Sequence, residues 1–365
     1  MNYKVSYSQS NLILAINPRY PFTKIGVYNN NKLIFLKKVN HSEDNLRIFK
    51  DCRKLAIIRK NAVLKELVDN NIPLNDIRVV ITRGGLTKPV KSGVYHINEN
   101  VVKDLGDCKM GKDIVNIGGL IASAISKELL NAHAFIADSV VVDEFDDLAR
   151  VTGLPELQRR SIFHALNQKA AARKYALSIG KKYEDLNLIV AYLGTGITVS
   201  AHKKSLVVDS NTGFDGDGPF SPIRAGSLPT GDLINLCFSG KYTQDELLTK
   251  VSIEGGLYAH LGTFSGEEVD SRVQNGDQKA AFIFEAMAYQ VSKAIGSMYP
   301  ALNGEVDAII ITGGIAHSQW FVRKITERVN KLAQVIVYPG ADDIETLAMR
   351  GLSVINGDEE VHEYE

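Results

Sequence analysis

The sequence predicts two related α/β domains, and three observations support this prediction. Residues 11–35 and 187–208 both begin Asn-Leu-Ile and both read as strand, loop, strand, polar turn and strand, the second copy starting 176 positions after the first (187 minus 11). Elsewhere, strand-length apolar runs end in glycine turns and alternate with segments of helical periodicity, which is typical of α/β folds. The 365 residues suffice for two domains that each bury a core. A ligand in the cleft between such domains would meet one turn from each repeat.

In the first half, apolar spacing and the positions of proline and glycine predict the elements that follow the first repeat. These are helices over Asn45–Asn70 and Asn116–Leu130, strands over Ile77–Thr82 and Ala134–Ile136, and a loop from Leu86 to Asn98 that contains Pro89 and Gly93.

The second half is expected to contain a long functional loop at residues 210–232, which is rich in Gly, Pro, Ser and Asp and has no periodicity. Its other expected elements are a helical region over Leu154–Leu177 with Pro155 in the first turn, helices near 243–250 and 277–298, a strand over Val306–Ile311, a helix from Ser318, a strand over Val335–Tyr338, and a final helix over Ile344–Arg350 that packs back on the first domain. We therefore expect a first domain of residues 1–150 with 345–365, and a second domain of residues 151–344.

Composition excludes several classes of function. The formal net charge is zero, so no broad attraction to nucleic acid or to an anionic membrane is expected. No apolar run approaches the roughly 20 residues that span a bilayer, and the polar N-terminus is unlike a signal peptide. The three cysteines, Cys52, Cys108 and Cys237, are far apart in the sequence and predict neither a disulfide framework nor a metal knuckle. These features predict a cytoplasmic protein.

Three predicted strands end in glycine-rich turns, where ligands of α/β domains gather. The turns are Arg83-Gly84-Gly85, Gly194-Thr195-Gly196 and Thr312-Gly313-Gly314. A glycine turn lets backbone N–H groups approach an anion, although an ordinary hairpin is the better explanation of an isolated Gly-x-Gly. Together with two arginines, Arg83 and Arg224, the turns indicate an anionic ligand, of which phosphate is the commonest. Phosphoryl transfer would require positioning and positive charge, which these residues can supply. The P-loop motif is absent.

Acidic residues in loops and at strand ends are candidates to hold Mg²⁺, because carboxylate oxygens are among its preferred ligands. A solvated turn or a helix cap is the alternative role for each of them. The candidates are Asp138, Asp143, Glu144, Asp209, Asp215, Asp217 and Asp343.

At these residues the chain resembles butyrate kinase and the branched-chain carboxylate kinases of the acetokinase family, within the sugar kinase/Hsp70/actin superfamily. The resemblance runs nearly end to end and includes long, specific segments. They are residues 83–98, 137–144, 161–176, 180–202, 215–226, 233–243 and 306–316.

The resemblance implies two actin-like (ribonuclease H-like) domains, each a mixed β-sheet with helices, closing on ATP or ADP with Mg²⁺. It implies reversible phosphorylation of a short-chain fatty acid, butyrate or a branched relative, to its acyl phosphate, by a homo-oligomer. By matching position, Arg83, Asp138 and Arg224 surround the transferring group. Asn17, Thr23, Lys24, Gly194, Thr195 and Gly196 belong to the phosphate loops, Thr312, Gly313 and Gly314 to the adenosine site, and Asn17 and Asp343 to the metal.

The chain departs from the family pattern in these ligand loops. The first loop of relatives reads Asn-Pro-Gly-Ser-Thr-Ser-Thr-Lys, whereas residues 17–24 here read Asn-Pro-Arg-Tyr-Pro-Phe-Thr-Lys. Proline removes an N–H group, and the aromatic residues add bulk. Further departures are Asp113, Tyr192, Thr195, Ile223 with Ala225, and Ala341.

Two main hypotheses follow from these departures, and an altered ligand, such as a bulkier acid or another phosphodonor, is the remaining alternative. The first is an active carboxylate kinase, supported by Arg83, Asp138, Arg224 and the Thr312-Gly313-Gly314 turn. The second is a catalytically impaired paralogue with a binding or subunit role, supported by the altered loop at residues 19–22, Asp113 and Tyr192.

Overall fold

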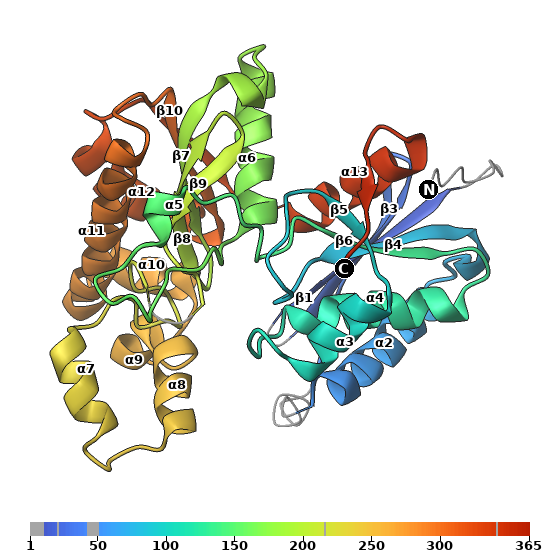
Figure 1. Cartoon of the computed structure of the whole chain (residues 1–365), viewed down its shortest axis with the longest axis horizontal. Coiled ribbons are helices and arrows are strands. Elements are labelled where there is room, and N and C mark those ends of the chain that lie inside the picture. The colour runs from blue at the N-terminus through green and yellow to red at the C-terminus, as the bar shows by residue number, and fades with distance from the viewer. Residues whose placement is uncertain (1–10, 20–21, 42–50, 215–216, 341) are drawn as a thin grey trace. The chain divides into compact units, whose positions relative to one another are not determined.

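The computed structural model describes residues 11–19, 22–41, 51–214, 217–340 and 342–365. The chain divides into two compact units: unit 1 comprises Met1–Val142 and Asp342–Glu365, and unit 2 comprises Asp143–Ala341. Each unit holds one β-sheet that mixes parallel and antiparallel strands and carries helices (Figure 1). The predicted α/β fold class is confirmed.

Unit 1 contains a seven-stranded sheet in the order β12-β5-β6-β4-β1-β2-β3. Strands β1, β2 and β3 form the antiparallel meander of the first repeat, β4 adds parallel to β1, and β6 adds parallel to β4. The strands span Leu12–Pro18 (β1), Phe22–Asn29 (β2), Lys32–Asn40 (β3), Ile77–Arg83 (β4), Val94–His96 (β5), His133–Ala137 (β6) and Val361–His362 (β12).

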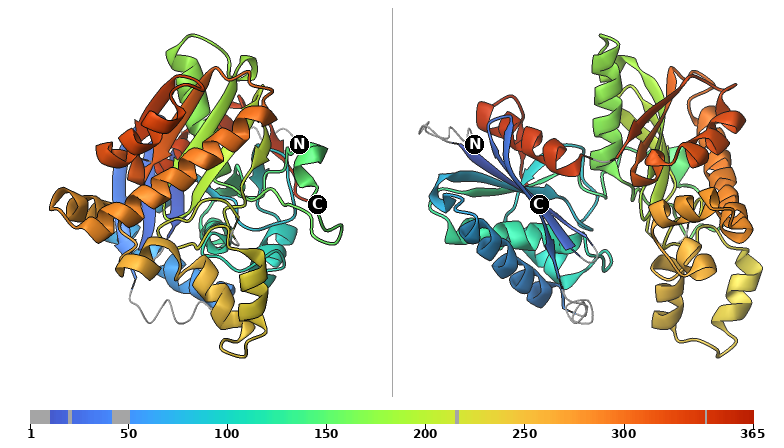
Figure 2. Two further views of the ribbon diagram at one scale, coloured as in Figure 1. Left: turned by 90° about the vertical axis from the view of Figure 1, so that its left-hand side faces the viewer. Right: turned by 180° about the vertical axis from the view of Figure 1, so that it is seen from behind.

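Helices cover both faces of this sheet (Figures 1 and 2). Alternate residues of β1, such as Leu14 and Ile16, share a core with α2 (Cys52–Asp69), α3 (Glu99–Asp107) and α4 (Asn116–Glu128). Ile13 of β1 faces the other way, where Gly351 allows α13 (Asp343–Asn356) to approach closely. The period-2 alternation of a strand thus places successive side chains under different helices.

Unit 2 repeats this arrangement in a five-stranded sheet with the order β11-β10-β7-β8-β9. Strands β7, β8 and β9 form the antiparallel meander of the second repeat, and β10 and β11 continue parallel beside β7. The strands span Asn187–Leu193 (β7), Ile197–Lys203 (β8), Leu206–Ser210 (β9), Ala308–Gly313 (β10) and Val335–Pro339 (β11).

The two faces of this second sheet are also covered by different helices. Ile189 and Ala191 pack in the core that contains α11 (Gln278–Ala301) and α12 (Gln319–Val329). Leu188 and Val190 face α6 (Ala165–Ser178). Among the described residues, unit 2 has further helical segments: α5 (Asp147–Arg150), α7 (Thr230–Cys237), α8 (Gln244–Ser252), α9 (Gly256–Leu261), α10 (Gly266–Gln274), and the short 3₁₀ turns η3 (Tyr183–Asp185) and η4 (Gly314–His317). Unit 1 has one more 3₁₀ turn in its described part, η2 (Leu74–Asp76).

The expected helical region at Leu154–Leu177 is wrong in its first part, because α6 begins only at Ala165. The preceding segment is tied to the end of the second meander instead. Arg159 forms an ion pair with Asp209 at 2.8 Å, and the Gly213 N–H donates to the Ile162 carbonyl at 2.7 Å. These long-range contacts override the local preference of a proline for a first helical turn.

Other boundaries also differ from those expected. Residues 94–96 form β5 inside the segment expected to be a loop, because they pair with β6. Helix α13 runs to Asn356, and residues 45–50 of the first expected helix lie outside the described residues. The division into units groups residues 143–150 with unit 2, where the Asp146 N–H donates to the Val208 carbonyl.

Cys52 and Cys108 are 56 positions apart in the sequence, yet their sulfur atoms lie 2.8 Å apart. Both are free thiols, and the hydrogen bond between Cys108 and Cys52 is the main cause that lowers the pKa of Cys108 to about 6. Within the described part of the chain, no helix is long and apolar enough to cross a membrane.

Candidate active site

The turn between β1 and β2 carries the first group of predicted site residues. Asn17 and Lys24 stand opposite each other in the two strands, on the face that α13 covers. The Asn17 Nδ2 atom donates to the Asp343 Oδ2 atom at 2.6 Å, and the guanidinium group of Arg19 contacts the same carboxylate oxygen. Asn17 and Asp343 are almost fully buried. The first residue of the last long helix therefore meets the end of the first strand.

The opposite face of this turn rests on a buried arginine that the sequence analysis did not single out. Arg59 of α2 is fully buried, and its Nη1 atom donates to the carbonyls of Arg19 at 2.9 Å and Phe22 at 3.3 Å. Nη1 also lies 3.3 Å from Thr23 Oγ1, which lies 2.9 Å from His41 Nε2. Burial, followed by the charge of Arg59, lowers the pKa of His41 to about 4.

Arg83 and Asp138 lie at the ends of the neighbouring strands β4 and β6, where Arg83 pairs with Ala137. Asp138 is fully buried and has a positive φ of 38°. Its Oδ1 atom accepts hydrogen bonds from Ser92 Oγ at 2.7 Å and from the Gly93 N–H at 3.2 Å, and Arg350 of α13 lies 3.4 Å away. Asp138 therefore anchors the segment before β5 to the end of β6.

The glycines after Arg83 have a packing reason. A Cβ atom on Gly84 would lie 2.7 Å from the backbone of Ser139, and one on Gly85 would lie 2.9 Å from the Cα atom of Asn116. The Asn116 Oδ1 atom also accepts a hydrogen bond from the Leu86 N–H at 2.9 Å. This turn is thus held tightly against α4 and the end of β6.

The Gly194-Thr195-Gly196 turn joins β7 to β8, and three side chains gather around it. A Cβ atom on Gly196 would lie 2.3 Å from Arg224 Nη1 and 3.3 Å from His164 Cε1, so glycine leaves the Arg224 guanidinium group the room to lie against the turn. The Ser221 hydroxyl donates to the Thr195 carbonyl at 2.7 Å and accepts from the Arg224 N–H at 3.1 Å. This turn therefore has a guanidinium group and an imidazole ring beside its backbone.

The ring of His164 is held on two sides. It stacks on Tyr192 with ring centroids 4.2 Å apart and an interplanar angle of 28°. Its Nδ1 atom lies 2.9 Å from Thr198 Oγ1. His164 lies in the segment 161–176 of the sequence, whose similarity to relatives was the available signal for it.

The Thr312-Gly313-Gly314 turn ends β10 next to the end of β7. Gly313 has a φ of +100°, and a Cβ atom there would lie 2.4 Å from the Leu193 carbonyl oxygen. Its backbone exchanges two hydrogen bonds of 3.0 Å with Gly340, and the Thr312 hydroxyl donates to the Gly340 carbonyl. A Cβ atom on Gly314 would meet nothing within 4 Å, so open space adjoins this position.

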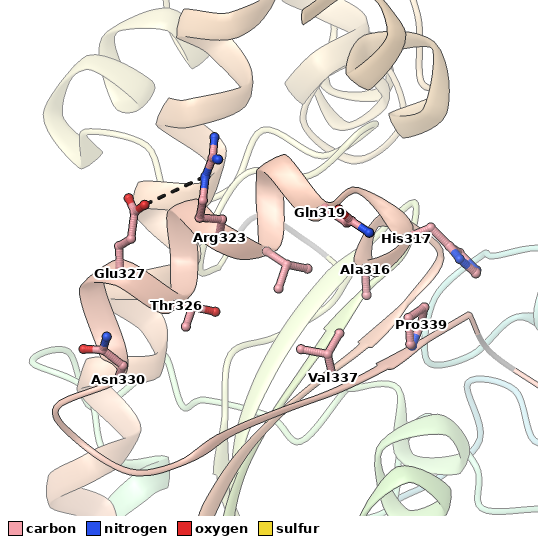
Figure 3. A pocket seen from close by; sticks show the side chains of 10 residues that line it. Ala316, His317, Gln319, Arg323, Thr326, Glu327, Asn330, Val337 and Pro339 are labelled. Atoms are coloured by element: carbon pink, nitrogen blue, oxygen red, sulfur yellow. Dashed lines mark ion pairs between the residues drawn. The ribbon is translucent and has the colours of Figure 1, made fainter. Parts of the chain in front are cut away.

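A pocket of about 620 Å³ lies in unit 2 between η4, α12 and β11 (Figure 3). His317, Val322 and Val337 are among its lining residues, and an ion pair between Arg323 and Glu327 crosses its helical wall. None of the predicted site residues that the structure describes lines it.

The structure therefore brings the predicted residues together in two groups. In unit 1, Asn17 and Asp343 meet at the end of β1, and Arg83 and Asp138 end the next two strands. In unit 2, Arg224 adjoins Gly196, and the Thr312 turn lies beside the end of β7. Three further residues, Arg59, His41 and His164, were not predicted from the sequence. Arg59 follows Leu55 and precedes Val63 at four-residue spacing, so it stands on the apolar face of its helix.

A family model and two curated relatives match this chain over long stretches. The family model described as the acetokinase family matches residues 155–356. Two curated relatives, butyrate kinase 1 and butyrate kinase 2 of Clostridium acetobutylicum, are each 45% identical to this chain over 352 residues, covering 96% of this chain and 99% of the relative.

Solved structures show the same fold at low sequence identity. A Porphyromonas gingivalis acetate kinase aligns with a TM-score of 0.75 and 16% identity, covering 95% of this chain and 100% of that chain. A propionate kinase from Francisella tularensis aligns with a TM-score of 0.72 and 16% identity, covering 93% and 98%. The family match and the full-length relatives lead to one conclusion: this chain belongs to the acetokinase family.

Proposed function

We propose that this protein transfers the γ-phosphoryl group of ATP to the carboxylate of a short-chain fatty acid, butyrate or a branched relative. The products are the acyl phosphate and ADP, and the reaction is reversible. The observation that carries the proposal is the 45% identity to two butyrate kinases across 96% of the chain. A catalytically impaired paralogue is not favoured, because Arg83, Asp138 and Arg224 are all held at the ends of sheet strands or beside a glycine turn.

Phosphoryl transfer depends mainly on positioning and on positive charge near the equatorial oxygens. In unit 2, Arg224 can supply this charge, because Gly196 leaves room for its guanidinium group directly beside the turn. The fork of N–H donors on an arginine matches phosphate and carboxylate oxygens in a way that a lysine does not. We assign Arg83 of unit 1 to a carboxylate or phosphoryl oxygen on the same chemical ground.

Asp138 has a supporting part in this proposal. Its Oδ1 atom already accepts from Ser92 and Gly93 and lies beside Arg350. These contacts fix the chain next to the end of β4, where Arg83 lies. The carboxylate would therefore act by keeping that strand end in place.

Asn17 and Asp343 fit a magnesium ion. The Asn17 Oδ1 atom is buried and has no hydrogen-bond partner among the residues that the structure describes, while its Nδ2 atom reaches the Asp343 carboxylate. Amide and carboxylate oxygens are ligands that Mg²⁺ accepts, usually with several waters. When bound, Mg²⁺ would neutralise charge on the phosphates of the nucleotide. Thr23 and Lys24 are proposed to complete the phosphate loop of unit 1.

The adenosine moiety is assigned to the Thr312-Gly313-Gly314 turn. The support is the open space beside Gly314 and the pairing of Gly313 with Gly340 through two backbone hydrogen bonds.

A homo-oligomer is also proposed, because large apolar side chains such as Phe238 (87% exposed) and Phe282 (73% exposed) face solvent in unit 2. Light scattering would then give a multiple of the 40.1 kDa chain mass.

An acyl-hydroxamate assay tests the reaction. The protein is incubated with ATP, Mg²⁺ and acetate, propionate, butyrate, isobutyrate or valerate in turn. Turnover on the order of 1–100 s⁻¹, highest for a four-carbon or branched acid, is expected. The Arg224→Met variant should lose at least about 100-fold in kcat. The control variant Arg328→Met removes an arginine of α12 that forms an ion pair with Glu285 of α11, and it should keep the wild-type kcat. Absence of acyl phosphate with every acid would overturn the proposal.

A further inference from the structure

We propose that Tyr183, His202, Gln168 and Thr198 form a one-directional hydrogen-bond relay that holds His164 as a neutral imidazole with its hydrogen on Nε2. The four are positioning residues for phosphoryl transfer, and His164 is the group that they position. The inference rests on the proposed function for its catalytic consequence. The position of the hydrogen on the His164 ring does not depend on that function, because it is inferred from hydrogen bonds within unit 2.

The relay is oriented by Gln168, which is fully buried. Its Nε2 atom donates to the Thr198 backbone carbonyl at 3.1 Å and to Thr198 Oγ1 at 2.8 Å. A backbone carbonyl can only accept, so the amide nitrogen must be the atom that faces Thr198. The Gln168 Oε1 atom then faces the other way, toward His202.

His202 continues the relay in the same direction. Its Nε2 atom lies 2.9 Å from Gln168 Oε1, which can only accept, so Nε2 must carry a hydrogen. Complete burial, followed by the nearby charges of Lys169 and Arg173, lowers the pKa of His202 well below its usual value. The ring is therefore neutral, and its Nδ1 atom accepts from the Tyr183 hydroxyl at 2.5 Å.

Thr198 transmits this direction to His164. Its Oγ1 atom accepts from Gln168, and its contacts with His164 are the backbone N–H at 3.4 Å and the ring Nδ1 at 2.9 Å. Among these partners only Nδ1 can accept the hydroxyl hydrogen. Nδ1 of His164 is thus an acceptor, and a neutral ring then carries its hydrogen on Nε2.

The position of the ring gives this tautomer its function. Stacking on Tyr192 fixes the plane, and the Cε1 atom, which links the two ring nitrogens, lies 3.3 Å from where a Cβ atom on Gly196 would stand. The ring that carries the Nε2 hydrogen therefore lies beside the glycine turn, as does Arg224. A fixed, neutral donor there stabilises charge that develops on a phosphoryl oxygen without any proton transfer.

Long-range ¹⁵N–¹H NMR spectroscopy of the full chain tests the tautomer directly. His164 is assigned among the eight histidines by comparison with His164→Gln. The wild-type protein should show Nδ1 unprotonated and Nε2 protonated near neutral pH, and Thr198→Val should show a mixture of both tautomers. A wild-type spectrum with the hydrogen on Nδ1 would overturn the relay. This readout needs no turnover, so it is separate from a failure of the proposed function.

Kinetics test the consequence. Thr198→Val, which keeps the shape of the side chain, should lower kcat about 10- to 100-fold and leave KM for ATP and the acid within about twofold. Thr198→Ser restores the hydroxyl and should recover kcat to within about threefold of the wild type. Thr249→Val on α8 is the matched control and should change neither constant. Unchanged kcat in a folded Thr198→Val variant would contradict the positioning role.

Discussion

The turn between β1 and β2 and the turn between β7 and β8 occupy equivalent places, because each joins the first two strands of an antiparallel meander. The first is held by charge: the buried guanidinium of Arg59 lies on one face and the Asp343 carboxylate on the other. The second is held by close approach to glycine and by neutral hydrogen bonds through Thr198. A turn made of glycine lets outside groups reach its backbone, whereas the first turn depends on buried ionic support.

The largest expected effect comes from removing the open space in the second turn. Gly196→Ala adds a Cβ atom 2.3 Å from Arg224 Nη1, and Gly196 does not have a positive φ that would strain alanine. Arg224 must therefore move, and kcat should fall by at least about 100-fold, since a shift of about 1 Å in a catalytic group has this effect.

The matched control for this change is Gly296→Ala on α11, where an added Cβ atom would meet nothing within 4 Å. Its kcat should equal that of the wild type. Full activity of Gly196→Ala in the hydroxamate assay would show that the second turn does not depend on glycine to admit Arg224.

The next effect is on stability and concerns the first turn. Arg59→Met deletes the buried donor to the Arg19 carbonyl and one of the two donors to the Phe22 carbonyl, which also accepts from the Arg19 N–H at 2.8 Å. We expect a loss of about 3 kcal/mol from the free energy of unfolding, measured from the first urea transition. Arg53→Met on the same helix removes an exposed ion pair with Asp107 and should cost about 0.5 kcal/mol or less.

Arg59 also makes the first turn sensitive to pH through His41. The folded protein lowers the pKa of His41 from 6.5 to about 4, mainly by burial and then by the charge of Arg59. Between these values the unfolded chain binds a proton that the folded chain does not, so stability falls as the pH is lowered through this window. The loss should be smaller in Arg59→Met, in which NMR titration should show a higher pKa for His41. An unchanged His41 pKa in Arg59→Met would contradict the effect of the Arg59 charge on His41.

Local pattern was sufficient to predict much of the second turn but little of what supports the first. The alternation of Ile197, Val199 and Ala201 and the glycines at 194 and 196 are short-range signals, and they predicted β8 and its turn correctly. Asn17 and Asp343 are 326 positions apart and are joined by a hydrogen bond. Only resemblance to relatives, and no local pattern, predicted that they belong together. Arg59 lies on the apolar face of its helix, where the sequence alone does not show which acceptors a buried guanidinium group would meet.

Tertiary contacts also explain the wrong helix start at Leu154. Pro155 suits a first helical turn by itself. The ion pair of Arg159 with Asp209 and the bond from Gly213 to Ile162 hold this segment against the end of the second meander. His164 follows this attached segment directly, as the residue that precedes the first residue of α6.

The smallest expected effect distinguishes two roles for the arginine that replaces a family glycine in the first turn. Arg19 contacts the Asp343 oxygen that also accepts from Asn17, and it is about one-third exposed. If Mg²⁺ uses this carboxylate, the guanidinium group competes with it. Arg19→Gln should therefore lower the Mg²⁺ concentration that gives half-maximal rate by about two- to fivefold, which corresponds to an ion pair worth up to about 1 kcal/mol. Lys32→Gln, a change at the end of strand β3 that pairs with Asn29, is the control and should leave the Mg²⁺ dependence unchanged. A fall in kcat at an unaltered Mg²⁺ requirement would instead show that Arg19 supplies charge to the phosphates, and the first turn would then resemble the second in using an arginine for catalysis.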